Sequence, residues 1–359
     1  MRPLWVNLNE QERAAFRAVT SFLDGRLEER STIDWALRLK PGDKVSRLAL
    51  LDLVNAMRGH TIREPWRSAW RLIEEAWESP HVEDHASTGD YLVQGRLHSG
   101  ERTGSLISAV VDLVRPRLSV KAFSESHKRY EQPIKRPKGV EDLFSIRVAS
   151  GRLIDPGVLN LERVTEPSFL VSLAVALEAA VVAGLEIARQ LGWEGKRGLW
   201  RMGQLHRVYY VPESERSDGD NEPDEFQHGI APSVKFLHAV VSRLAEVNIS
   251  IATEFTRRWK ATNSPVHLRL WAALARDSRI APASEVGTML LALDDDRFWN
   301  LNAYPEVAEL RAKRFKDLAD HDQIALIARI RKCPPAINGH EKLILHSSGK
   351  RDFFGLLKN

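Results

Sequence analysis

A glycine-rich stretch between residues 95 and 105 carries side chains that could bind an anion. It ends in Thr103-Gly104-Ser105 and runs directly into an apolar helical pattern, so free backbone N–H groups at that helix start and the nearby arginines could converge on a phosphate. A P-loop also requires a lysine before its final Ser or Thr, and this stretch has none. The pattern favours a helix cap with exposed arginines, and the alternative is an anion site made of Arg96, Arg102, Gly104 and Ser105.

Basic residues dominate the stretch from 115 to 147, with prolines and aromatic residues between them. Lysine and arginine contact phosphate groups, and exposed aromatic rings stack on bases, so this is the best nucleic-acid candidate in the sequence. The simpler interpretation is an irregular, solvated linker between two domains. The basic residues assigned to the nucleic-acid alternative are Arg115, Arg117, Lys128, Arg129, Lys135, Arg136 and Lys138.

Two other stretches hold the residue types of metal ligands without a suitable spacing. His81 and His85 would share one face of a helix, but Pro80 and the polar surroundings favour a loop. The three aspartates at 294–296 would point about 100° apart on a helix, so they cannot converge on one ion. We therefore assign no metal ligand and no cofactor, and we interpret residues 294–296 as a charged helix end.

Nucleophilic residues are present without the patterns that activate them. The sequence holds no Gly-x-Ser-x-Gly elbow, and its single cysteine, Cys333, has no feature beside it that explains a lowered pKa. Ser347-Ser348-Gly349-Lys350 is similar to the end of a phosphate loop, but Ile344 occupies the position of the required first glycine. We therefore assign no catalytic residue.

The composition is that of a folded protein with a small net charge. Of its 359 residues 43% are hydrophobic, and 52 Lys and Arg oppose 48 Asp and Glu, which gives a net charge of +4. So small an excess does not imply a uniform attraction to nucleic acid or acidic lipid. A single cysteine excludes an internal disulfide, and residues 1–16 contain no apolar segment of signal-peptide length. We expect a cytoplasmic protein that does not contact a membrane.

One long apolar helix at 168–191 is the element around which the rest must be arranged. Pro167 suits its first turn and Gly192 ends it. Its length would fit a membrane span, but ionisable residues interrupt it, so we predict a central core helix. Glu178 and Glu186 need partners in a dry core. Arginines from neighbouring helices are the favoured partners, and a paired-carboxylate metal or acid/base site is the alternative.

Helical patterns also fill most of the remaining sequence. Apolar residues recur every three or four positions in runs joined by short polar or proline-bearing turns. Trp66, Trp70 and Trp77 form a stripe at this spacing, which is more typical of a core than of a ligand surface. Only residues 199–211 have a strand-like composition.

These patterns predict an all-α fold, in which a helical bundle is followed by HEAT-like stacked helical hairpins. No fixed sequence period marks a repeat. We expect an N-terminal helical domain at 1–114, a basic proline-containing linker at 115–160, a helical array at 161–334 around the central helix, and an atypical C-terminal tail at 335–359.

Parts of the sequence resemble the helical portion of large uncharacterised bacterial proteins, some of which lie in phage-defence loci. The stretches that carry the resemblance are 100–107, 111–118, 268–275, 294–299 and 304–306. They contain no catalytic motif. The resemblance implies that the chain is the helical portion of a larger system, and it implies no chemistry.

Extended helical arrays expose long surfaces that recognise partners without catalysis. We therefore predict a non-enzymatic scaffold or interaction module with a protein partner, placed in a bacterial defence system by the resemblance. One alternative is a nucleic-acid-binding component that uses the basic 115–147 segment, and another is an enzyme whose residues are not recognisable.

Overall fold

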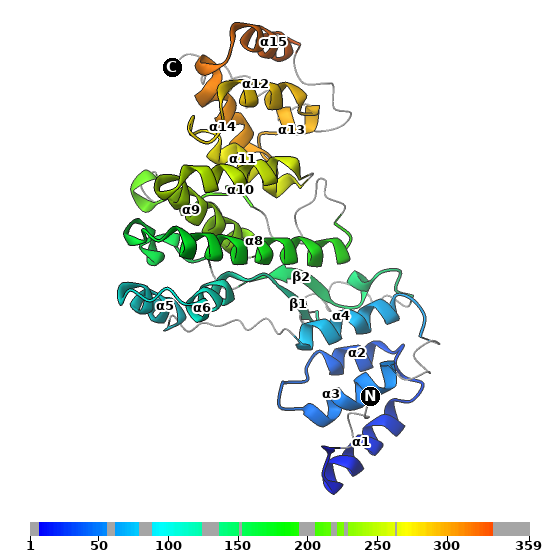
Figure 1. The fold of residues 1–359 in the computed structure, drawn as a ribbon. Helices are drawn as coiled ribbons and strands as arrows, with labels where there is room; N and C mark the ends of the chain where they lie inside the picture. Colours follow the sequence, from blue (N-terminus) through cyan, green and yellow to red (C-terminus); the bar gives the residue numbers. More distant parts are fainter. Residues whose placement is uncertain are drawn as a thin grey trace.

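The chain is a mainly α-helical protein, which confirms the predicted all-α fold class; the HEAT-like repeat stays a prediction. Figure 1 shows the helices stacked one after another along an elongated molecule, from α1 at one end to α15 at the other. The structure is a computed structural model that describes residues 7–55, 62–78, 88–123, 136–150, 153–193, 205–216, 221–225, 229–262 and 264–332.

The N-terminal helices form as the sequence predicts. The first begins at a capping box: Asn9 Oδ1 accepts from the Glu12 N–H at 2.9 Å, and Glu12 Oε2 accepts from the Asn9 N–H at 2.8 Å. Trp70 is 2% exposed, so the tryptophan stripe is confirmed as core at this position. The helices are α1 (Glu10–Leu23), α2 (Arg30–Ala36), α3 (Lys44–Asn55), α4 (Trp66–Glu78), α5 (Thr88–His98) and α6 (Gly104–Val114).

A two-stranded antiparallel sheet lies where the sequence predicted an irregular linker. β1 (Arg117–Lys121) pairs with β2 (Ser145–Ala149), with Leu118 opposite Val148. Both of these side chains are 2% exposed, so each strand contributes to the core. Residues 199–211 have a strand-like composition that a helix would also fit, but 205–211 form neither a strand nor an α-helix, and residues 199–204 lie outside the described ranges.

The central helix is α8 (Pro167–Gln190), which has proline in its first turn and packs against α6 and α9. Glu178 has the arginine partner that the sequence predicts: its carboxylate accepts from Arg258 Nη2 at 2.9 Å and from Trp259 Nε1 at 2.8 Å. Glu186 instead pairs with Arg189 on its own helix at 3.0 Å. Neither contact forms a paired-carboxylate site.

By length and composition, α8 is the one helix in the described ranges that could cross a membrane. Half of its most apolar 18-residue stretch is buried against other parts of the chain, and Glu178 lies near the middle of the helix. Ten of its residues are buried, among them Leu170, Leu177 and Val181. These features are consistent with the core helix of a soluble protein.

The C-terminal half continues the stack. Asn248 caps α10 by accepting from the Ile251 N–H at 3.3 Å, and Asp294 caps α13 by accepting from the Arg297 N–H at 2.8 Å. The interpretation of 294–296 as a charged helix end is thereby confirmed. The helices are α9 (Ala231–Val247), α10 (Ile249–Ala261), α11 (Pro265–Leu274), α12 (Ala283–Ala292), α13 (Asp295–Trp299), α14 (Pro305–Arg314) and α15 (Asp320–Arg331).

Candidate functional site

An irregular segment, residues 205–211, is held against the C-terminal helices by buried charged side chains. Arg269 of α11 is 1% exposed and donates to the carbonyl oxygens of Leu205 at 2.8 Å and His206 at 2.9 Å. Glu306 of α14, which is fully buried, accepts from Arg269 Nε at 2.6 Å and from the Val208 N–H at 2.8 Å. The ion pair therefore supplies hydrogen bonds that this non-helical backbone cannot make to itself.

A second buried cation holds the other side of the same segment. Lys235 of α9 is fully buried, and its ammonium donates to Glu222 Oε1 at 2.5 Å and to the Tyr209 carbonyl oxygen at 2.9 Å. Asp224 Oδ2 lies 2.9 Å from the same nitrogen. Burial raises the pKa of Asp224, but Lys235 and the His206 N–H outweigh this effect and hold the pKa below its ordinary value. Lys235 therefore lies within ion-pair distance of two buried acidic side chains.

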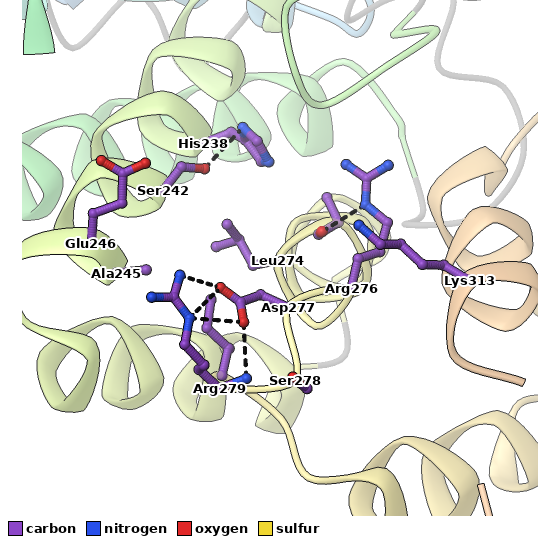
Figure 2. Close-up of a pocket in the computed structure, with 12 residues that line it drawn as sticks. His238, Ser242, Ala245, Glu246, Leu274, Arg276, Asp277, Ser278, Arg279 and Lys313 are labelled. Atoms are coloured by element: carbon purple, nitrogen blue, oxygen red, sulfur yellow. Dashed lines mark hydrogen bonds and ion pairs between the residues drawn. The ribbon is translucent and has the colours of Figure 1, made fainter. Parts of the chain in front are cut away.

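Beside this segment lies a cleft of about 590 Å³ between α9, α11 and α14. Figure 2 shows His238, Ser242 and Glu246 on one side, and the residues that follow α11 on the other. Ser242 Oγ lies 3.5 Å from His238 Nδ1, which is long for a hydrogen bond that would activate a nucleophile.

The charged wall of the cleft is held in place by several contacts. Arg276 Nε donates to the Ala273 carbonyl oxygen at 2.9 Å, and Nη1 donates to Glu309 Oε2 at 2.8 Å. Its guanidinium also lies 4.7 Å from the centre of the Tyr209 ring. Since Tyr209 belongs to the clamped segment, the buried ion pairs indirectly fix the position of this arginine.

His238 is neutral in this cleft. Burial is the largest cause, and the nearby Arg276 and Lys235 add to it, so that the pKa of the imidazole falls to about 3. Its ring contacts the Tyr209 ring, with 5.8 Å between the centroids. A neutral, half-buried imidazole adds hydrogen-bonding capacity to the cleft without adding charge.

This neutral histidine makes the protein's stability depend on pH. The pKa of His238 is lower in the folded chain than in the unfolded chain. As the pH falls below about 6.5, the unfolded chain takes up a proton that the folded chain does not, so the free energy of unfolding decreases. Between pH 7.5 and 5, His238→Gln should lose about 1–2 kcal/mol less than the parent chain in urea unfolding. His321→Gln, at an exposed position, is the control and should behave as the parent. Equal pH slopes in the parent and His238→Gln would contradict the assignment.

The predicted anion-binding residues lie together at the start of α6, but their charges are engaged. Arg96 pairs with Glu101 at 2.5 Å and donates to Ser105 Oγ at 3.1 Å. Arg102 pairs with Glu166 at 3.2 Å. Arg96 and, more weakly, the Thr103 hydroxyl lower the pKa of Glu101 to about 2.

Thr103 caps α6, which begins at Gly104, by accepting from the Leu106 N–H at 3.2 Å. The predicted helix cap is confirmed, but its arginines are partly buried: the side chains of Arg96 and Arg102 are 34% and 18% exposed. Anion binding there stays a prediction, and each arginine already faces a carboxylate.

The structure brings together only part of the predicted nucleic-acid surface. Arg115 and Arg117 both lie near Asp112, at 4.0 and 3.6 Å. Arg136 and Lys138 are exposed ahead of the turn that leads into β2. The other positions of interest lie outside the described residues, namely Lys128, Arg129, Lys135, His81, His85, Cys333 and the tail at 335–359.

Sequence reasoning missed the cleft and the buried ion pairs behind it. The signal was present: Lys235 stands between Val234 and Phe236, and Arg269 stands between two leucines. A charged residue inside an apolar helical run needs a buried partner. That partner, however, comes from distant parts of the chain that spacing alone cannot identify.

Comparison with known proteins gives one distant relative and no function. The chain is 23% identical over 259 residues to a Sinorhizobium fredii (strain NBRC 101917 / NGR234) protein described as uncharacterized protein y4cA. The match covers 69% of this chain and 19% of that protein, so the chain spans about a fifth of its relative's length. The chain matches no protein-family model. No solved structure matches it significantly.

Proposed function

We propose that the chain is a helical interaction module that binds a protein partner through the cleft between α9, α11 and α14. The observation that carries the proposal is a cleft of about 590 Å³. Its charged wall contacts Tyr209, which belongs to the segment that the buried ion pairs hold in place. Side chains that are fixed before binding lose little conformational entropy when a partner arrives, which favours recognition.

The residues that follow α11 fit a protein contact because they reach solvent from a rigid helix end. Arg279 is 60% exposed and pairs with Asp277 at 2.6 Å. On the opposite wall Glu246, also 60% exposed, pairs with Arg243 at 2.6 Å. Charges of both signs therefore face a partner across the cleft, and such patterns give specificity and orientation in protein complexes.

Charge reversal at Arg279 tests this proposal. The tagged chain and its Arg279→Glu variant would be used to recover binding proteins from the native host, followed by quantitative mass spectrometry. A protein that uses the cleft should be recovered about tenfold less with the variant, because like charges at an interface oppose binding. Lys316→Glu is the matched control, since Lys316 is exposed and does not line the cleft. Equal loss with both variants, or with neither, would contradict the proposal.

The other predicted function is tested with the same purified protein. Fluorescence anisotropy with labelled single- and double-stranded DNA and RNA, at low and near-physiological salt, measures nucleic-acid binding directly. Affinity that falls steeply with salt would favour the basic 115–147 segment as the functional surface. The bacterial defence system stays a prediction from the sequence resemblance, and the much longer relative supports only the idea of a larger protein.

A further inference from the structure

Positive charge exceeds negative charge at the α11–α14 end of the cleft. Glu309 pairs with Arg276 at 2.8 Å and with Arg207 at 3.4 Å, and it also accepts from the Tyr209 hydroxyl at 2.9 Å. One carboxylate therefore serves two guanidinium groups. Of the charged residues that line the cleft, Arg276, Arg279 and Lys313 oppose Asp277 and Glu246, which leaves a net charge of about +1, while Arg207 balances Glu309 behind them.

Lys313 is the cation of this group that is free to bind a ligand. It is exposed, it lines the cleft, and it makes no hydrogen bond or ion pair with other residues in the part of the chain that the structure describes. Asp277 is already held by Arg279 through three contacts of 2.6 to 3.1 Å. These contacts are the main cause of its lowered pKa, to which Lys313 adds only a weak electrostatic effect. Figure 2 shows Lys313 reaching from α14 toward the side of the cleft that carries Arg276.

Unused hydrogen-bond donors at this end of the cleft could bind an anion. Arg276 has one terminal nitrogen, Nη2, that makes no hydrogen bond within the described residues, and Lys313 offers three N–H donors. A phosphoryl group has three acceptor oxygens and about −1.5 to −2 charges at pH 7, so it could accept from Arg276 Nη2 and from the Lys313 ammonium at the same time. A carboxylate has only two acceptor oxygens for the same donors.

We propose that the Arg276–Lys313 end of the cleft binds a phosphoryl group. The group belongs either to a phosphorylated side chain of the partner or to a free phosphorylated small molecule. The inference rests on the proposed function only for the first of these sources. A cleft of about 590 Å³ lies in the size range of small-molecule sites, so it also accommodates the second.

Thermal unfolding of the purified chain in sodium phosphate, compared with sodium chloride at equal ionic strength, tests the site. Phosphate should raise the melting temperature of the parent chain. Lys313→Gln should weaken the apparent phosphate affinity at least about tenfold, because it removes a charged donor. The matched control is Lys316→Gln, an exposed lysine outside the cleft, which should keep the parent affinity.

Two peptides distinguish the sources of the group: Gly-Gly-phosphoserine-Gly-Gly and its unphosphorylated form. Tighter binding of the phosphopeptide than of inorganic phosphate would assign the group to a partner chain, and equal binding would assign it to a small molecule. Equal stabilisation by phosphate and chloride, or the same loss of affinity in both lysine variants, would overturn the proposal. Neither result would contradict the proposed binding of a protein partner, because the Arg279→Glu test of that proposal needs no phosphate.

Discussion

Replacing Arg269 with methionine should lower the free energy of unfolding by about 3–5 kcal/mol, the largest effect that we expect from a single substitution in the cleft region. The guanidinium is 1% exposed and pairs with the fully buried Glu306 at 2.6 Å. Its removal leaves a carboxylate in a dry environment and leaves the carbonyl oxygens of Leu205 and His206 without this donor.

Urea unfolding of the parent, Arg269→Met, Glu306→Leu and the double variant measures this effect. The double variant should be less destabilised than the sum of the two single variants, because it removes both charges together. Additive effects, or a loss below about 1 kcal/mol in Arg269→Met, would show that the pair is not a buried ion pair in solution.

A second large effect is expected at Lys235, where methionine should also lower the free energy of unfolding by about 3–5 kcal/mol at pH 7. The substitution leaves Glu222 and Asp224 buried and close together without the ammonium that now lies 2.5 and 2.9 Å from them. Burial without a countercharge raises the pKa of a carboxyl group above its ordinary value.

The Lys235→Met defect should therefore shrink as the pH falls from 7 to 5, since protonation neutralises the buried carboxylates in the variant. Unfolding curves at several pH values check this sign. Lys316→Met, at an exposed position, should differ from the parent by less than about 0.5 kcal/mol. A Lys235→Met defect that is constant over this pH range would contradict the charge explanation.

The helices were predictable because their signals are local. The central helix is an example: the sequence predicts 168–191 and the structure has Pro167–Gln190, since proline in the first turn and glycine after the end act within a few residues. The capping box at Asn9 is equally local. The arginine partner of Glu178 could be predicted in kind, because a carboxylate in a core needs a cation, but its identity as Arg258 could not.

The strands and the cleft were not predictable because they depend on distant pairing. β1 and β2 come from opposite ends of a proline-containing basic stretch, and each is stable only against the other and the helical core. In the same way Arg269 finds Glu306 across 37 residues and binds carbonyl oxygens more than 60 residues earlier. Composition marked 115–160 as a linker, whereas Leu118 and Val148 of that stretch are buried in the core.

Photocrosslinking in the native host tests most directly whether the cleft is the contact surface. A photoreactive benzoylphenylalanine would replace Ser278, which is exposed and lines the cleft, or Ser172, which is exposed on α8. We predict a covalent adduct with one protein from position 278, absent from position 172 and strongly reduced by an added Arg279→Glu substitution. The same adduct from both positions, or no protein adduct from position 278, would contradict the proposed function.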